Sequence, residues 1–409
     1  MKEKKVVLVN RAVYLPGEGG YKRTMYLFDM MRRNGHSPIL LTSDFNHYKK
    51  QERDIEKFKL EHPDYAEDIV FVHTITYKKN ISFNRYLAEL CWTKAVKKWF
   101  QNNAKDIDAV MLSMPDMNTI LAIKDICEFY NIEMIIDVRD LRPEAFRVLV
   151  KNEILYEILF NSMKRKADRA YACADKLFAV SNEYLSRGAS ANKKAKVKKV
   201  VYIGAILNLF DEGVKKYSHK IKKSKDEIWL TYAGTLGESY DLTTCIDAVK
   251  KIKDAGKYNI KFMVLGQGPD ADALKKYAVD IGATNVEFVG FVEYGKMAAY
   301  LSKSDISINA IKKRGSQSII NKVADYFAAG IPMLNGCVCK EQQEMVNQYA
   351  VGLNYEPENV DSLVDKLQVL LDNPERREQY GKNARKLALD KFDREHSYYE
   401  IINEIYNIR

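Results

Sequence analysis

Residues 315–332 read GSQSIINKVADYFAAGIP, and their apolar residues recur at the three- and four-residue spacing of a helix. Gly330 and Pro332 predict where that helix ends, because glycine accepts the left-handed exit conformation and proline cannot continue the hydrogen-bond ladder. The polar residues of the stretch share one helix face; they are Ser318, Asn321, Lys322 and Asp325. The pattern predicts a helix that packs on one side and carries a polar cluster on the other.

The polar cluster suits a ligand with an anionic part and a polyhydroxyl part. A helix N-terminus attracts phosphate through its unpaired N–H groups and its dipole, and Ser318 and Lys322 add a hydroxyl and an ammonium. The Asp325 carboxylate can accept hydrogen bonds from sugar hydroxyls. A nucleotide sugar has both parts. A surface ion pair between Lys322 and Asp325 is the alternative interpretation.

Short apolar runs alternate with helical patterns along the whole chain, which predicts parallel sheets covered on both faces. We expect two Rossmann-like domains, at 1–205 and 206–390, with a helix at 391–409 that packs back on the first domain. The lysine-rich stretch 211–226 is predicted to be a linker. The expected strands are 5–10, 37–43, 69–74, 109–113, 133–138, 176–181, 197–203, 228–234, 260–266, 286–291, 305–310 and 331–335.

Glycine-containing turns follow several of these strands. They are PGEGG (16–20), AGTLG (233–237) and LGQGP (265–269). Ligands of such sheets bind beyond the carboxyl ends of the strands, so we expect the site in a cleft between the two domains. Each turn alone is a weak signal, and LGQGP also fits a plain strand-to-helix turn because the third glycine of a dinucleotide fingerprint is missing.

Charge and cysteine usage narrow the class of protein. Of the net charge of +10, all lies in residues 1–205, which hold 36 Lys and Arg against 26 Asp and Glu. Such asymmetry suggests a polyanionic partner for the first half, either an anionic membrane or nucleic acid. No apolar run is long enough to span a bilayer, and no secretory signal is evident. The six scattered cysteines suggest reduced thiols in a cytoplasmic protein.

SIINKVADYFAAGIP resembles the signature of retaining GT-B glycosyltransferases of family 4, in which Asn-Lys precedes an acidic-Tyr-x-Ala-Ala-Gly-x-Pro helix. Other stretches resemble the family in the same order along the chain: residues 13–43, DKLFAVSNEYL (175–185), LTYAGTLGESYDLTTCIDAVKKI (230–252) and NVEFVGFVEYGKMAAYLSKSDISI (285–308). DVRDLRP (137–143) is similar to bacterial capsule and O-antigen enzymes of the N-acetylfucosamine transferase kind. The resemblance implies a GT-B fold, with two Rossmann-like domains whose parallel sheets face each other across a cleft.

The resemblance also implies site residues. The donor-binding set is Gly19, Gly20, Gly234, Thr235, Gly266, Gln317, Ser318, Asn321, Lys322 and Asp325, and the catalytic set is Arg139, Asp140 and Lys322. The sequence departs from the family at several of these positions. Gln317 and Asp325 stand where two glutamates are usual, and Thr235 and Tyr240 match the Arg and Lys that hold the diphosphate. Lys322, with the helix dipole and Lys312, Lys313 or Arg314, must then neutralise that group.

We expect no metal ion and no other cofactor. The two Asp-x-Asp stretches, DID (106–108) and DAD (270–272), fall where a helix begins or a strand approaches, and acidic residues at helix starts explain DAD. N–H groups and lysines would then stabilise the leaving group, as oxyanion-hole donors do. The resemblance implies transfer with retention of anomeric configuration.

Two segments of the basic half, 83–100 and 146–169, combine large apolar residues with lysine and arginine. Such segments suit interfacial membrane binding, although a buried helix with a solvated charged end fits each pattern as well.

The expected function is transfer of a sugar, most simply from a UDP-sugar, to a lipid-linked saccharide acceptor in bacterial surface polysaccharide synthesis. The expected location is the cytoplasm, peripheral at the inner face of the membrane. A non-hydrolysing sugar-nucleotide 2-epimerase and a non-catalytic GT-B partner subunit are the alternatives. No motif supports nucleic-acid binding.

Overall fold

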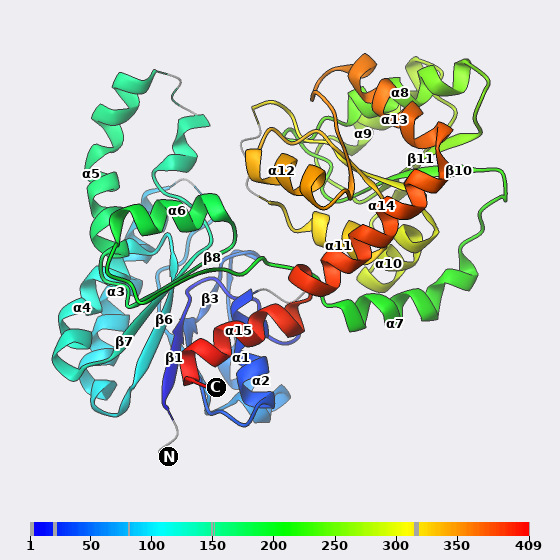
Figure 1. The fold of residues 1–409 in the computed structure, drawn as a ribbon. Coiled ribbons are helices and arrows are strands. Elements are labelled where there is room, and N and C mark those ends of the chain that lie inside the picture. The colour runs from blue at the N-terminus through cyan, green and yellow to red at the C-terminus, as the bar shows by residue number, and fades with distance from the viewer. Residues whose placement is uncertain are drawn as a thin grey trace. The chain divides into compact units, whose positions relative to one another are not determined.

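The computed structural model describes residues 4–18, 23–80, 82–148, 150, 152–314 and 319–408. The chain forms two compact units (Figure 1). Unit 1 comprises Met1–Val201 and Tyr398–Arg409, and unit 2 comprises Tyr202–Ser397.

Unit 1 is built on a seven-stranded sheet in which every strand pairing is parallel. In spatial order the strands are β5 (Ile69–Val72), β2 (Ile39–Ser43), β1 (Val6–Val9), β6 (Ala109–Met114), β7 (Glu133–Val138), β8 (Lys176–Ala179) and β9 (Val197–Val200). The order of the strands along the chain reverses between β1 and β6. A short antiparallel hairpin of β3 (Phe45–Asn46) and β4 (Gln51–Glu52) lies outside this sheet.

Helices bury both faces of the unit 1 sheet. Their bounds are α1 (Arg23–Arg33), α2 (Ile55–Glu61), α3 (Phe83–Asn103), α4 (Met117–Tyr130), α5 (Glu153–Tyr171), α6 (Asn182–Ala191) and α15 (Arg394–Tyr406), with 3₁₀ turns at Pro63–Tyr65, Ala104–Asp106 and Glu144–Val148. On one face, Trp92, Val96 and Phe100 of α3 pack in the same core as Val7 and Val110 of the strands. Segment 83–100 is therefore a core helix. Of its two interpretations, the structure supports the buried helix.

Unit 2 contains a six-stranded parallel sheet. Its spatial order is β12 (Val286–Gly290), β11 (Ile260–Leu265), β10 (Ile228–Ala233), β13 (Ile306–Asn309), β14 (Met333–Asn335) and β15 (Gly352–Asn354). Successive residues of β10 enter different cores, with Leu230 and Tyr232 on one face and Trp229 and Ala233 on the other. This alternation is what a strand buried on both faces requires. The order reverses between β10 and β13.

The helices of unit 2 are α7 (Leu207–Tyr217), α8 (Leu242–Asp254), α9 (Ala271–Asp280), α10 (Tyr294–Lys303), α11 (Lys322–Ala328), α12 (Lys340–Gln348), α13 (Val360–Asp372) and α14 (Pro374–Leu387), with a 3₁₀ turn at Ser218–Lys220 and a π-helical turn at Ala388–Phe392. All twelve strands expected from the sequence are present, and the prediction of two parallel α/β sheets is confirmed. The sequence analysis missed β15 and the β3–β4 hairpin, because three- and two-residue strands leave almost no pattern.

The predicted linker at 211–226 is wrong, because most of its first half lies in helix α7. Phe210 is buried, and Gly213 lies against Gly295 of α10 so closely that a Cβ at position 213 would come within 2.5 Å of the Gly295 Cα. The lysines of this stretch obscured the helical pattern. Lys215 and Lys216 are exposed, whereas Gly213 makes the contact with α10.

Helix α15 brings the chain back to unit 1. Tyr398 stacks edge-on against Tyr26, with the ring centroids 5.7 Å apart, and the Tyr406 ring lies parallel to the His36 ring at 3.5 Å. The Lys4 ammonium donates to the carbonyl of Ile405 at 2.7 Å. These contacts join the end of the chain to unit 1. Among the described residues, no helix is both long and apolar enough to cross a bilayer.

Candidate functional site

The candidate site of unit 2 lies at the carboxyl ends of β10 and β13, where the strand order reverses. Gly234, directly after β10, has φ +155°, and Gly266, directly after β11, has φ +139°. A Cβ at Gly266 would lie 1.8 Å from the Gly234 carbonyl oxygen, so the two turns approach too closely for any side chain there. Two of the predicted donor-binding glycines are therefore in contact at the edge where ligands of such sheets bind.

Lys322 is the first residue of α11, and its ammonium lies beside the Gly234 turn. The Lys322 Nζ donates to the Tyr232 hydroxyl at 2.8 Å and lies over the rings of Tyr232 and Tyr240, 4.1 and 3.8 Å from their centroids. The Tyr232 hydroxyl in turn donates to the Thr235 carbonyl at 2.7 Å. Burial lowers the pKa of Lys322 well below its ordinary value. Within the described residues no carboxylate forms an ion pair with Lys322, so the alternative of a Lys322–Asp325 pair does not hold.

Asp325 lies one turn after Lys322 on α11 and is bonded to α10. One of its carboxylate oxygens accepts from the Tyr294 hydroxyl at 2.7 Å. Burial raises the pKa of Asp325 to about 6, while Tyr294 and Arg394 act in the opposite direction. On the same helix, the Tyr326 hydroxyl accepts from the backbone N–H of Ala233 at 3.0 Å, which fixes α11 against the end of β10.

The other donor-binding predictions have different outcomes. Thr235 is exposed beside Gly234, and Asn321 is an exposed residue at the start of α11 whose side chain makes no capping hydrogen bond. Gly19, Gly20, Gln317 and Ser318 lie outside the described residues. Helix α11 also begins several residues later than the sequence pattern predicted, at Lys322.

The sequence analysis did not identify Tyr232 and Tyr294 as site residues, and it treated Tyr240 only as a missing lysine. The available signal for Tyr232 was a phenol hydroxyl in a mostly apolar strand, two positions before a glycine. Tyr240 and Tyr294 carry no comparable signal, because only the fold brings their elements to Lys322 and Asp325.

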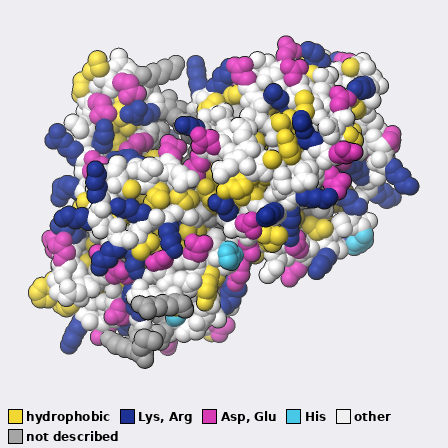
Figure 2. All heavy atoms as spheres, viewed as in Figure 1, with side chains coloured by type: hydrophobic (Ala, Val, Ile, Leu, Met, Phe, Trp, Pro, Cys, Tyr) yellow, Lys and Arg dark blue, Asp and Glu magenta, His cyan; other side chains and the backbone are white. Residues whose placement is uncertain are grey.

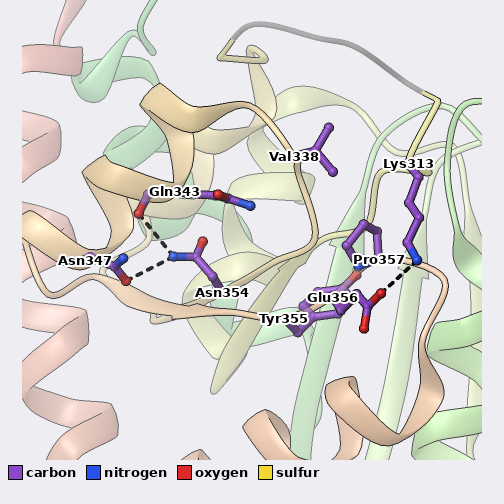
Figure 3. A pocket seen from close by; sticks show the side chains of 8 residues that line it. All are labelled: Lys313, Val338, Gln343, Asn347, Asn354, Tyr355, Glu356 and Pro357. Atoms are coloured by element: carbon purple, nitrogen blue, oxygen red, sulfur yellow. Dashed lines mark hydrogen bonds and ion pairs between the residues drawn. The ribbon is translucent and has the colours of Figure 1, made fainter.

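A hollow of unit 2 lies along β15 and α12 (Figure 3). At one end, the Lys313 ammonium pairs with the Glu356 carboxylate at 2.8 Å. At the other, the Asn354 amide donates to the Gln343 carbonyl at 3.1 Å and to the Asn347 side chain at 3.0 Å. Lys313, one of the cations expected to help neutralise a diphosphate, is therefore already paired with a carboxylate.

In unit 1, Arg139 follows β7 and points toward α1. One guanidinium nitrogen donates to the Thr24 hydroxyl at 2.8 Å, and its Nε lies 3.9 Å from the Asp137 carboxylate. Asp137 also accepts two hydrogen bonds from Arg23, at 2.8 and 3.0 Å. Both side chains of this ion pair are buried, with 1% of Arg23 and 2% of Asp137 exposed. Burial and the Arg23 charge lower the pKa of Arg139, and Asp137 opposes this.

Asp140, the other catalytic prediction in unit 1, is half-buried. Burial raises the pKa of its carboxyl, while Arg142 opposes the shift. Arg139 and Asp140 are thus neighbours in sequence that interact with different partners.

The two Asp-x-Asp stretches have structural roles in the part of the chain that the structure describes. Asp270 precedes α9 and the Asp272 side chain is 99% exposed, as expected for acidic residues at a helix start. The Asp108 carboxylate accepts from the backbone N–H of Lys5 at 2.7 Å. No group of three or more histidine, cysteine or acidic side chains with a metal-binding arrangement occurs in the described ranges.

Residues 214–387 match the family profile described as Glycosyl transferases group 1. The matched stretch covers most of unit 2. Among curated relatives, WcaI of Escherichia coli (strain K12), a colanic acid biosynthesis glycosyl transferase by name, is 26% identical over 183 residues, which are 43% of this chain and 42% of WcaI. A second is the GDP-mannose-dependent monoacylated alpha-(1-6)-phosphatidylinositol monomannoside mannosyltransferase of Corynebacterium glutamicum. It is 28% identical over 135 residues, or 32% of this chain and 35% of that protein.

The match to both relatives spans less than half of their length. A solved structure, Alr3699/HepE of Anabaena in complex with UDP, is similar over 99% of this chain and 100% of that one, with a TM-score of 0.70 and 14% identity. The architecture of the whole chain is thus the GT-B fold, as the sequence analysis expected, with parallel sheets of seven and six strands.

The raised pKa of Asp325 predicts a pH-dependent stability difference. The folded carboxyl titrates near 6 against an ordinary value of 3.8, so ionisation costs free energy only in the folded state. Protonation of Asp325 therefore stabilises the folded protein. This contribution to the free energy of unfolding is fully present below about pH 4 and is lost as the pH rises through 6. We expect the melting temperature of Asp325→Asn, relative to the parent protein, to rise between pH 4 and pH 7, by the equivalent of about 3 kcal/mol at most. A difference that is constant with pH would contradict the assignment; calorimetric melting at several pH values is the measurement.

Proposed function

We propose that this chain transfers a sugar from a nucleotide-diphosphate donor, a UDP-sugar in the first instance, to a saccharide acceptor with retention of configuration. The observation that carries the proposal is the Lys322 ammonium beside the Gly234 turn, at the strand-order reversal of unit 2. Tyr232 and Tyr240 contact this ammonium, and no carboxylate of the described residues forms an ion pair with it. A buried cation without a counter-ion is costly. The diphosphate of a nucleotide sugar would supply that counter-ion.

The named ligands of two relatives support the donor class. HepE binds UDP in its crystal structure, and the Corynebacterium protein is named for GDP-mannose. We assign UDP because the HepE likeness extends over the whole chain, whereas the mannosyltransferase match covers a third of it. In this assignment Asp325 accepts from a ribose hydroxyl through the oxygen that Tyr294 does not use.

The chemistry follows from charge. As the bond from the sugar to the diphosphate breaks, negative charge grows on the leaving oxygen, and a cation already fixed in place stabilises it without rearranging. Lys322 supplies that cation, and Arg139 and Asp140 of unit 1 act beside the acceptor and the leaving group. Gly19, Gly20, Gly266, Gln317, Ser318 and Asn321 complete the proposed donor site.

Incubation with a panel of nucleotide sugars tests the function. We expect UDP-sugars to raise the melting temperature and to be consumed only with an acceptor. Release of an epimerised nucleotide sugar without acceptor would identify a 2-epimerase, and binding without turnover would identify a non-catalytic partner subunit.

Donor binding should depend on Lys322. We expect Lys322→Ala to weaken UDP-sugar binding by about 1.5–3 kcal/mol, because a charge-assisted hydrogen bond to phosphate is lost. Lys313→Ala is the matched control, since that lysine is already paired with Glu356 and should change affinity little. Calorimetric titration with a UDP-sugar measures both. Equal affinity in the parent and Lys322→Ala would show that the donor binds elsewhere.

Turnover should not require a divalent ion. The leaving-group charge is assigned to Lys322, so activity measured after treatment with EDTA should equal activity without it. Loss of turnover with EDTA that Mn²⁺ restores would contradict this assignment and return attention to Asp270 and Asp272.

We further propose that the acceptor is lipid-linked and that unit 1 binds an anionic membrane at the cytoplasmic face, in bacterial surface polysaccharide synthesis. Helix α5 stands out from the rest of unit 1 in Figure 1. Its first turns leave large apolar side chains in solvent. They are Ile154, Leu155, Ile158 and Leu159, with 75, 48, 73 and 56% exposed. Figure 2 shows hydrophobic atoms among charged ones where α5 lies. Lys164, Arg165 and Lys166 follow on the same helix.

The amphipathic start of α5 supports an interfacial helix because large apolar side chains would enter the headgroup region while the cations interact with anionic lipids. Of the two interpretations of segment 146–169, we therefore favour membrane binding. The buried residues of α5 are concentrated in its last turns, where Ala167, Ala170 and Tyr171 join the unit 1 core.

Vesicle binding should need both parts of α5. We expect salt-sensitive binding to anionic vesicles, and its loss when Ile154 and Ile158 are replaced by Ser or when Lys164, Arg165 and Lys166 are replaced by Glu, since each cation contributes about 1 kcal/mol near an anionic leaflet. Leu60→Ser is the control for the apolar change, because the Leu60 side chain on α2 is 82% exposed. Replacement of the exposed Lys193, Lys194 and Lys196 by Glu is the control for the charge change.

Cosedimentation with anionic and neutral vesicles at low and high salt is the measurement, with UDP affinity confirming that each variant is folded. Recovery of the parent protein in the supernatant under all conditions would favour a soluble acceptor.

A further inference from the structure

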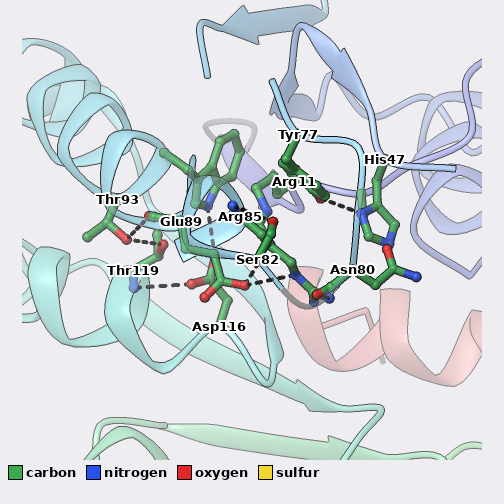
Figure 4. Close-up of polar contacts among 12 residues, drawn as sticks. Arg11, His47, Tyr77, Asn80, Ser82, Arg85, Glu89, Thr93, Asp116 and Thr119 are labelled. Atoms are coloured by element: carbon green, nitrogen blue, oxygen red, sulfur yellow. Dashed lines mark hydrogen bonds and ion pairs between the residues drawn. The ribbon is translucent and has the colours of Figure 1, made fainter. Parts of the chain in front are cut away.

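Two arginines of unit 1 share a single carboxylate near the carboxyl end of its sheet (Figure 4), and Lys50 adds a third cation to the same cluster. Arg11 follows β1, and one of its nitrogens lies 3.0 Å from a Glu89 oxygen. Arg85, in the first turn of α3, has its Nε 3.5 Å from the same oxygen. Lys50, at the β3–β4 hairpin, donates to the Asn80 side-chain carbonyl at 2.5 Å, and no described carboxylate forms an ion pair with it. The cluster has more positive charge than Glu89 can balance.

The cluster also leaves hydrogen-bonding capacity unused. The second terminal nitrogen of Arg11 is buried and has no partner among the described residues. Asp116 lies nearby, but its carboxylate already accepts from the Trp92 indole at 2.8 Å and from the Thr119 backbone at 3.3 Å. A buried guanidinium nitrogen without an acceptor is costly, so an oxygen supplied by a ligand would stabilise this arrangement.

Neighbouring groups respond to the excess positive charge. The His47 Nδ1 contacts the Tyr77 hydroxyl and lies 3.4 Å from the Lys50 ammonium. Burial, together with the smaller effects of the Lys50, Arg85 and Arg11 charges, lowers the pKa of His47 to about 4. The pKa of Lys50 is lowered by burial and then by Arg85 and Arg11. Cations that disfavour each other's charge favour an anion between them.

The backbone and rings around Lys50 also indicate a built site. Lys50 has φ +58°, a left-handed conformation that residues with a side chain adopt rarely and that clusters at functional sites. Next to it, Tyr48 is 42% exposed and stacks on Tyr14 at 3.9 Å with the rings 8° apart. The Tyr48 and His47 rings meet edge to face at 5.2 Å. A flat aromatic pair beside cations suits a sugar ring that carries a phosphate.

We propose that Arg11, Lys50 and Arg85 bind a phosphate group of the acceptor while Tyr14 and Tyr48 pack against the adjoining sugar. The proposal rests on the glycosyltransferase function proposed above and specifies what that enzyme's acceptor must carry. The phosphate belongs either to the diphosphate of a lipid-linked saccharide or to a phosphorylated sugar without lipid.

The imidazole of His47 is a local reporter of an anion at this cluster. In nuclear magnetic resonance titrations of the full chain saturated with UDP, the His47 signals are assigned by their loss in His47→Gln. The probes are inorganic pyrophosphate, a sugar phosphate and a short-chain prenyl diphosphate sugar. We expect at least one to raise the pKa of His47, because an anion favours the imidazolium. The probe with the lowest half-saturating concentration identifies the source of the phosphate.

Substitutions separate binding from a structural role. Lys50→Ala and Arg85→Gln should weaken binding of the effective probe about tenfold or more, in line with a lost charge-assisted hydrogen bond. Lys49→Ala, at the exposed neighbour on the same hairpin, should change it less than about twofold, as for other surface charges. Glu89→Gln should tighten binding, because it removes the carboxylate charge that pairs with Arg11 and Arg85 and keeps a hydrogen-bond acceptor.

The outcomes distinguish this proposal from the proposed function. UDP binding with His47 unmoved by every probe overturns the phosphate site and leaves the donor assignment standing. A shift of His47 in a protein that does not bind UDP supports the anion site and overturns the donor assignment. Weaker binding in Glu89→Gln, with the melting temperature unchanged, would mean that Glu89 itself contacts the ligand and would overturn the proposed charge balance.

Discussion

The close approach of two turns at Gly234 determines how the unit 2 site is built. The Gly234 N–H donates to the Leu265 carbonyl at 2.9 Å, and its own carbonyl leaves no room for a Cβ at Gly266. On its other side, a Cβ at Gly234 would be 2.8 Å from the Lys322 ammonium. The glycines therefore let backbone, rather than side chain, form the wall next to the cation. That arrangement suits a ligand whose oxygens must come close to main-chain groups.

The two units treat buried positive charge in opposite ways. In unit 1, Arg23 receives a carboxylate partner with two bonds and is closed off from solvent, which completes its charge balance inside the fold. In unit 2, Lys322 has aromatic faces and one hydroxyl, which attract a cation but carry no full negative charge. The first arrangement stabilises the folded structure. In the second, a bound anion would stabilise the charged, ammonium form of Lys322.

Most of the architecture could be predicted from the sequence because strands buried on both faces produce continuous apolar runs such as KVVLVN and IKFMVLG. Helix α7 could not, because lysines on its outer side masked a contact made through Gly213. The site was predicted in part. Lys322 and Asp325 stand in one recognisable segment, whereas Tyr232, Tyr240 and Tyr294 come from three separate elements. The cluster of Arg11, Lys50 and Arg85 is formed by segments that no local pattern connects.

The return of the chain to unit 1 has a consequence for the order in which the protein takes shape during synthesis. Ile401, Ile402 and Ile405 of α15 are fully buried, and carbonyls of the same helix accept from Lys4 and Lys176. A ribosome delivers these residues only after all of Tyr202–Ser397 has emerged. Until then, residues 1–201 have part of their apolar surface uncovered. Unit 2 is one continuous stretch of the chain, so it needs no later segment to complete its core. Although unit 1 is translated first, it is the unit whose core is completed last.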